Sequence, residues 1–185
     1  MLTLALNILD IVQNSVRAKS TDIRIGIRES VKNDILEIRI CDNGTGMPVE
    51  LLNNATDPFF TTRKTRKVGL GLPLLKYQAE IAGGSLQIDS TMGKGSTVKA
   101  SFSLSHIDRQ PLGDIVGVMT ILISANPDIS FLYNHITDTG EYVFSSRETR
   151  EYLGINDFRD SGLLSDIREM INENLKEIGV AEMVL

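Results

Sequence analysis

Residues 35–47 read ILEIRICDNGTGM, an alternating apolar run followed by an acid and two closely spaced glycines. The alternation of isoleucines with charged residues predicts a β-strand with one buried face. Asp42, at the end of this strand, is therefore a carboxylate held in a defined direction. Gly44 and Gly46 allow positive φ angles and the close approach of a flat ligand such as a nucleobase. Asp-Asn-Gly is equally good chemistry for a plain tight turn, and this stretch alone leaves both interpretations open.

Residues 1–18 have the spacing of a helix that is apolar around most of its circumference. The exception is a narrow polar stripe, made of Thr3, Asn7, Asp10, Asn14 and Arg17. Polar groups within an apolar helix need partners, since each unpaired one costs about 1–3 kcal/mol. The stripe could face water, as on any amphipathic helix, but its narrowness favours the floor of a site.

A second pair of glycines, Gly69 and Gly71, opens a predicted helix that continues to Ala82. Backbone N–H groups at a helix N-terminus are free to bind an anion, and the helix dipole favours negative charge there. Phosphate groups are therefore expected at this point. A lone pair of glycines also serves ordinary loop-to-helix turns, so this signal is weak by itself.

The order of elements predicts an α+β fold. Up to residue 105 the pattern is helix, two strands, loop, helix, two strands, which suits a mixed sheet with helices packed on one face. Residues 106–111 have the composition of a linker. Residues 112–185 contain a capped helix, a hairpin and a final amphipathic helix, which predict a small α+β module of unknown role. We find no catalytic constellation in this C-terminal part.

Composition excludes several classes of protein. The chain has 185 residues, of which 42% are hydrophobic and 23% charged, enough for a folded core. A net charge of −5 argues against a nucleic-acid surface. Cys41 is the single cysteine, so no disulfide framework or cysteine-based metal site is expected. No apolar run approaches the ~20 residues of a membrane span, and no leader sequence is evident. We expect a cytoplasmic protein without a membrane partner.

Taken together, several stretches in order resemble the sequence boxes of the GHKL ATPase superfamily, which has the Bergerat fold. Residues 10–14 resemble the N box and 42–47 the first glycine box, while 57–62 resemble the F box. Residues 69–72 and 93–97 resemble the later glycine boxes. The F box and the 69–72 box follow the histidine-kinase pattern, whereas the N box is also similar to that of MutL. The resemblance covers residues 2–105 and implies a two-layer α/β sandwich.

The resemblance implies a role for each matching residue. Asp42 would accept from the adenine amino group of ATP, with Ser96 or Thr97 helping through water. Asn14 would hold Mg²⁺, a metal that needs few protein oxygens beside water and phosphate. Gly69 and Gly71 would cradle the phosphates, beneath a short lid. Lys64, Arg66 and Lys67 would form this lid. The full set of residues expected to contact the nucleotide is Asn14, Asp42, Gly44, Gly46, Met47, Phe59, Lys64, Arg66, Lys67, Gly69, Leu70, Gly71, Leu72, Ser96 and Thr97.

This chain departs from the family pattern at Asp10. ATP-hydrolysing members have a glutamate there as general base, and aspartate is shorter by one methylene, about 1.5 Å. A misplacement of about 1 Å can cost 10²-fold in rate, so we expect slow hydrolysis. Neither His106 nor His135 lies in the helical setting of a phospho-accepting histidine. Autophosphorylation on histidine in cis is therefore not expected.

Three functions stay open at this point. The first is a stand-alone kinase that phosphorylates a partner in trans, with Asp10 as its catalytic group. The second is an ATP-gated protein-interaction module with little turnover. The third is a slow ATPase of the MutL kind. The apolar face of the final helix could pack on the first domain or form a homodimer.

Overall fold

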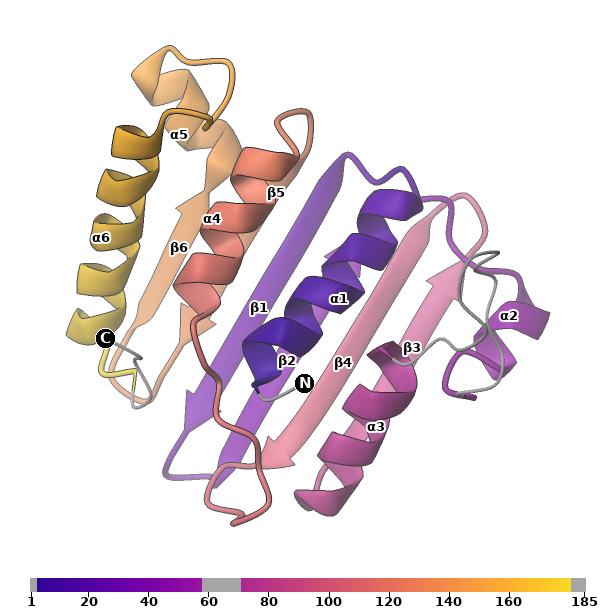
Figure 1. Cartoon of the computed structure of the whole chain (residues 1–185). Coiled ribbons are helices and arrows are strands. Elements are labelled where there is room, and N and C mark those ends of the chain that lie inside the picture. Colours follow the sequence, from indigo (N-terminus) through magenta and orange to yellow (C-terminus); the bar gives the residue numbers. More distant parts are fainter. Residues whose placement is uncertain (1–2, 58–70, 181–185) are drawn as a thin grey trace.

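The computed structural model describes residues 3–57 and 71–180, and these form one six-stranded mixed sheet (Figure 1). The strand order is β3-β4-β2-β1-β5-β6. The strands are β1 (Asp22–Ser30), β2 (Ile35–Asp42), β3 (Ser85–Thr91), β4 (Gly95–Ser103), β5 (Ser130–Ile136) and β6 (Glu141–Ser145). All neighbouring pairs are antiparallel except β1 and β5, which run parallel.

Helices cover one face of this sheet, as predicted, and leave the other face open (Figure 1). The helices are α1 (Leu4–Arg17), α2 (Val49–Asn53), α3 (Gly71–Ile81), α4 (Ile115–Ala125), α5 (Ser146–Leu153) and α6 (Ser161–Glu177). Helices α3, α1, α4 and α6 follow one another across the covered face. The expected α+β fold class is confirmed. Within the described part of the chain, no helix is long and apolar enough to cross a membrane.

The core forms because the strands alternate and α1 is apolar on most sides. In β1 the isoleucines at 23, 25 and 27 are buried, while Arg24 and Arg28 are exposed on the open face. In β2 the buried positions are 36, 38 and 40, so the register that aims Asp42 also builds the core. Burial of each such side chain contributes about 1.5–3 kcal/mol to stability.

The C-terminal part of the chain extends the sheet of the first part. Phe131 in β5 lies opposite Ile23 in β1, and the β5–β6 hairpin continues the sheet to its edge. The connecting segment is fixed as well, since the backbone N–H groups of Leu4 and Ala5 donate to carbonyls of residues 111 and 112. Parallel pairing between segments so far apart in sequence leaves no local signal, and for this reason the predicted hairpin could not be placed from sequence.

Candidate nucleotide site

The carboxylate of Asp42 accepts three hydrogen bonds at the end of β2. Ser20 Oγ and the Gly44 N–H donate to Oδ1, at 3.1 and 2.8 Å. Ser15 Oγ, on α1, donates to Oδ2 at 2.8 Å. A carboxylate has about four lone-pair sites, so Oδ2 keeps one site for a further donor. Asp42 is therefore oriented by three elements and can still accept from a ligand.

The glycines after Asp42 are required by close packing of the loop. A Cβ on Gly44 would lie 2.6 Å from Ser20 Oγ, and a Cβ on Gly46 would lie 2.1 Å from the Thr91 carbonyl oxygen. Gly46 also has a φ of +65°, which disfavours other residues. The loop is thus wedged between the α1–β1 connection and the β3–β4 turn. Close packing against the rest of the protein accounts for these glycines.

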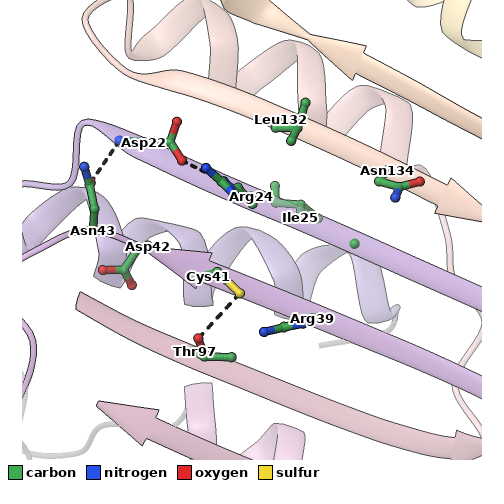
Figure 2. A pocket seen from close by; sticks show the side chains of 11 residues that line it. Asp22, Arg24, Ile25, Arg39, Cys41, Asp42, Asn43, Thr97, Leu132 and Asn134 are labelled. Atoms are coloured by element: carbon green, nitrogen blue, oxygen red, sulfur yellow. Dashed lines mark hydrogen bonds and ion pairs between the residues drawn. The ribbon is translucent and has the colours of Figure 1, made fainter. Parts of the chain in front are cut away.

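Met47 and Ser96 are connected through a residue that the sequence did not single out. Ser90 Oγ accepts from the Met47 N–H at 2.8 Å and lies 2.9 Å from Ser96 Oγ. Ser96 is opposite Asp42 in the β2–β4 register. Thr97 is the next residue, so its side chain lies on the other face, where it donates to Cys41 Sγ at 3.5 Å (Figure 2). Of the two residues expected to assist Asp42, only Ser96 is on the same face of the sheet.

Asp10 lies directly against the start of α3. A Cβ on Gly71 would be 2.0 Å from Asp10 Oδ2, so only glycine leaves room for the carboxylate in this position. Gly71, the described glycine of the predicted pair, thus meets the polar stripe of α1 at a helix N-terminus, which favours negative charge. Leu72 packs against the core beside it. Asn14, one turn along α1, is half-buried, and its Oδ1 accepts from Arg17 Nη1 at 2.9 Å.

The other half of the polar stripe does not belong to the site. Asn7 is buried, and its Nδ2 donates to Gln110 Oε1 at 3.1 Å. A Cβ on Gly113 would lie 2.6 Å from the Thr3 side chain, so these residues pack closely. The segment that connects β4 to α4 therefore covers this end of α1. Asp10 and Asn14 therefore stay the candidates for a site on this stripe, whereas Thr3 and Asn7 pack against the connecting segment.

The described residues include only part of the expected nucleotide-contacting set. Phe59, Lys64, Arg66, Lys67, Gly69 and Leu70 lie outside the described residues. Conversely, the structure adds Ser15 and Ser20 to the site, both as donors to Asp42. Ser15 follows Asn14 directly, but its position at the sheet side of α1 depends on how the helix packs. No signal in the sequence separates it from an ordinary helical serine.

Among the residues that the structure describes, no three His, Cys, Asp or Glu side chains are grouped to hold a metal ion. Mg²⁺ at an ATP site needs no such cage, since water and phosphate supply most of its ligands. The amide oxygen of Asn14, half-buried and one helical turn from Asp10, has the right donor chemistry. The residues present therefore fit Mg²⁺ that is bound together with a nucleotide.

A sheet covered by helices on one face, with an aimed aspartate and glycine-rich turns at one end, defines an ATPase domain of Bergerat type. Residues 2–106 match the family "Histidine kinase-, DNA gyrase B-, and HSP90-like ATPase". The match spans more than half of the chain, and the chain belongs to this family.

Several curated relatives are named as sensor proteins. A "Putative sensor protein" of Shewanella frigidimarina is 36% identical over 103 residues, which are 55% of this chain and 16% of that protein. A "Putative sensor histidine kinase NtrY-like" of Rickettsia conorii is 29% identical over 103 residues, 56% of this chain and 17% of that protein. The chain thus spans about a sixth of the length of these relatives.

Among solved structures, the N-terminal domain of a DNA repair protein has a similar fold. The TM-score is 0.57 at 17% identity, and the match covers 79% of this chain and 53% of that one. The structural match is longer than the family match, so it includes part of the chain after residue 106. At this identity the likeness concerns the fold alone.

Proposed function

We propose that this chain binds Mg-ATP and transfers its terminal phosphoryl group to a partner protein in trans. The observation that carries the proposal is the carboxylate of Asp42, which has three internal donors and one lone-pair site left on Oδ2. The adenine amino group is a donor that suits this site. Guanine has a carbonyl oxygen at the corresponding ring position, and a carboxylate would repel it. The site therefore selects adenine over guanine.

Asn14 and the start of α3 would bind the triphosphate end. Asn14 Oδ1 is the proposed protein ligand of Mg²⁺, and Arg17 Nη1 would turn away from it to a phosphate oxygen. The N–H groups at Gly71 would donate to the phosphates, together with Gly69 as the family resemblance implies. The cations at 64, 66 and 67 would neutralise the triphosphate as a lid. Mg²⁺ supplies the charge neutralisation that phosphoryl transfer requires.

Asp10 is the proposed catalytic residue because it lies where the phosphates are expected. Its Oδ2 occupies the space above Gly71, at the N-terminus of α3. In the transfer, an oxygen or nitrogen of the partner attacks the γ-phosphorus, the bond to the β-phosphate oxygen breaks, and ADP leaves. Asp10 would accept the proton from the attacking group. Water would be a poorer nucleophile here, since the shorter acid does not reach it as glutamate would.

An ATP-gated interaction module is the second candidate, and the C-terminal part of the chain favours it. We propose residues 1–105 as the ATP-binding unit and 112–185 as a module attached to it through 106–111. Because β5 pairs with β1, a change at the nucleotide site would be passed to this module through a continuous sheet. In this case ATP binding alone would alter a partner surface.

The experiment that tests the proposal follows the γ-phosphate. Purified chain is incubated with Mg²⁺ and ATP labelled on the γ-phosphate, both alone and with cell lysate. The proposal predicts label on a lysate protein, and loss of that label with the Asp10→Asn variant. Label that stays on bound ATP would contradict the kinase and support the gated module. Label released as inorganic phosphate at the same rate with and without lysate would support a slow ATPase.

A further inference from the structure

The open face of the sheet has a hollow whose lining includes Asp42 and Thr97 at one end and extends across the strands to Asn134. It has a volume of about 510 Å³ and lies over β1, β2 and β5, on the side away from the helices (Figure 2). Its floor is Gly26 in the middle of β1, between Arg39 on β2 and Asn134 on β5. Leu132 forms an apolar wall. The residues that face it come from strands that meet only in the folded protein.

Gly26 has no structural reason to be glycine. Its φ is not among the positive values of this chain, and an added Cβ would meet nothing closer than 3.9 Å. Glycine within a central strand costs stability, because it loses more conformational entropy and packs no side chain. A glycine that the fold does not need often marks a point where a ligand or another backbone comes close. The absence of a side chain at Gly26 is thus an observation in favour of a binding site.

Arg39 is an uncompensated charge at this hollow. Lys99 lies directly opposite it on β4, and like charges in this arrangement destabilise a sheet. Lys99 is paired with Glu37 at 2.8 Å, and Arg24 is paired with Asp22 at 3.0 Å. Arg39 itself forms no ion pair with any residue of 3–57 or 71–180. A guanidinium in this state is available to bind a carboxylate.

Asn134 supplies the complementary group. Its Nδ2 donates to Glu141 Oε1 at 3.0 Å, while its Oδ1 is buried and has no hydrogen-bond partner in the described part of the chain. A buried acceptor without a donor costs about 1–3 kcal/mol. At this hollow, Arg39 therefore has no anionic partner and Asn134 Oδ1 has no N–H or O–H donor among the described residues.

From this arrangement we propose that the open face binds an acidic segment of a partner protein, with Gly26 beneath it. An acidic side chain would pair with Arg39, and a backbone N–H of the same segment would donate to Asn134 Oδ1. An apolar neighbour would pack on Leu132. One short peptide offers all three groups at the spacing of an extended chain, whereas a free anion offers only the first. The wide, open shape of the hollow also suits a chain lying across strands.

The test uses a short end-capped peptide of alternating glutamate and leucine, and a control peptide with glutamine for each glutamate. Amide NMR spectra of the full chain are recorded during each titration. The proposal predicts shifts at Gly26 and Asn134 with the acidic peptide, and binding at least about tenfold weaker with the neutral one. No binding at millimolar peptide would overturn it. Shifts confined to residues 42–47 would also overturn it, since the peptide would then occupy the nucleotide site.

Two variants locate the interaction. Arg39→Gln removes the free charge, and Gly26→Val places a side chain that strands favour on the floor of the hollow. Each is expected to weaken peptide binding about tenfold or more, while Gly26→Val leaves the unfolding midpoint unchanged or raised. Arg147→Gln removes the same charge from exposed α5 and should have no effect. Equal binding by wild type and Arg39→Gln would contradict the proposed site. Inorganic phosphate that displaces the peptide completely would show a free-anion site instead.

Discussion

Ser15 Oγ on α1 donates to Asp42 Oδ2 at 2.8 Å, and this bond joins the polar stripe to the end of β2. Both residues are needed to understand the site, because Asp42 would otherwise be oriented only by its own loop and by Ser20. The bond leaves one lone-pair site of Oδ2 for a ligand. In the proposed site, α1 would therefore contribute to base binding through Ser15 and to phosphate binding through Asp10.

Removal of this bond should weaken nucleotide binding modestly. We expect Ser15→Ala to lower the Mg-ATP affinity about two- to tenfold, because a hydrogen bond of this kind contributes about 0.5–1.5 kcal/mol. Isothermal titration calorimetry measures the change. Ser124→Ala is the control, since Ser124 on α4 bonds only to a carbonyl of its own helix in the described structure. An unchanged affinity in Ser15→Ala would show that the bond does not preorganise Asp42.

Asp10→Asn separates binding from phosphoryl transfer. The variant keeps the size of the side chain above Gly71 and removes its ability to accept a proton. We expect the Mg-ATP affinity to stay within about threefold and transfer of the label to fall about 10²-fold or more, as for loss of a general base. Labelled-ATP assays and calorimetry on the same sample provide both values. Undiminished transfer would exclude Asp10 as the base.

Two glycines with the same backbone angle allow a matched test of the packed loop. Gly46 and Gly154 have φ values of +65° and +64°. A Cβ at 46 would meet the Thr91 carbonyl oxygen at 2.1 Å, whereas a Cβ at 154 would meet nothing within 4 Å. We expect Gly154→Ala to cost about 1 kcal/mol of stability and Gly46→Ala clearly more, since only the second forces the loop from the β3–β4 turn. Urea unfolding of both variants measures the two losses of stability. Equal losses would contradict the close packing of the loop against the β3–β4 turn.

Alkaline pH should destabilise the fold through two tyrosines. Burial, and to a smaller extent the nearby Glu29, raises the pKa of Tyr133 well above its usual value, and burial raises the pKa of Tyr142 to about 12. The neutral phenols are favoured in the folded state, while an unfolded tyrosine titrates near pH 10. Their contribution to stability is therefore complete below about pH 10 and is lost as the pH rises to about 12 and beyond.

Urea midpoints measured at pH 8, 10 and 11 test this expectation, because stability should fall only in the last interval. Tyr142→Phe should reduce the fall relative to wild type. A fall of the same size in this variant would assign the effect to other groups, such as lysines. The Tyr133 hydroxyl lies 2.7 Å from His135 Nδ1, and His135 Nε2 lies 3.0 Å from Glu29 Oε1, so Tyr133 is the less suitable residue to replace.

Local patterns were sufficient to predict much of this molecule. The alternation around Ile38 and Ile40 predicted β2, and the spacing of apolar residues predicted α1. The glycine pair predicted the start of a helix, and α3 begins at Gly71. These features depend on residues near one another in sequence or on a periodic pattern. For that reason a single sequence is sufficient to predict these elements.

Features that depend on distant pairing were not predicted. The parallel contact of β5 with β1 joins segments about a hundred residues apart, and no pattern in either segment specifies it. The cover of Asn7 by Gln110 has the same origin. So does the placement of Ser96, and not Thr97, on the face of Asp42, because it depends on the register of β2 with β4. The residues at 58–70, which hold several expected ligands of ATP, lie outside the described structure.

Asp42 receives the adenine ring in the proposed site, and calorimetry with the Asp42→Asn variant tests this contact most directly. An amide there would lose the charged acceptor and would face the donors of Ser15, Ser20 and Gly44 with an NH₂ group. We expect Mg-ATP binding to fall at least about 100-fold in this variant, while the control Asp89→Asn, at an exposed position of β3, binds as wild type. Circular dichroism confirms that both variants are folded. Unchanged affinity of folded Asp42→Asn for Mg-ATP would contradict the assignment of the site.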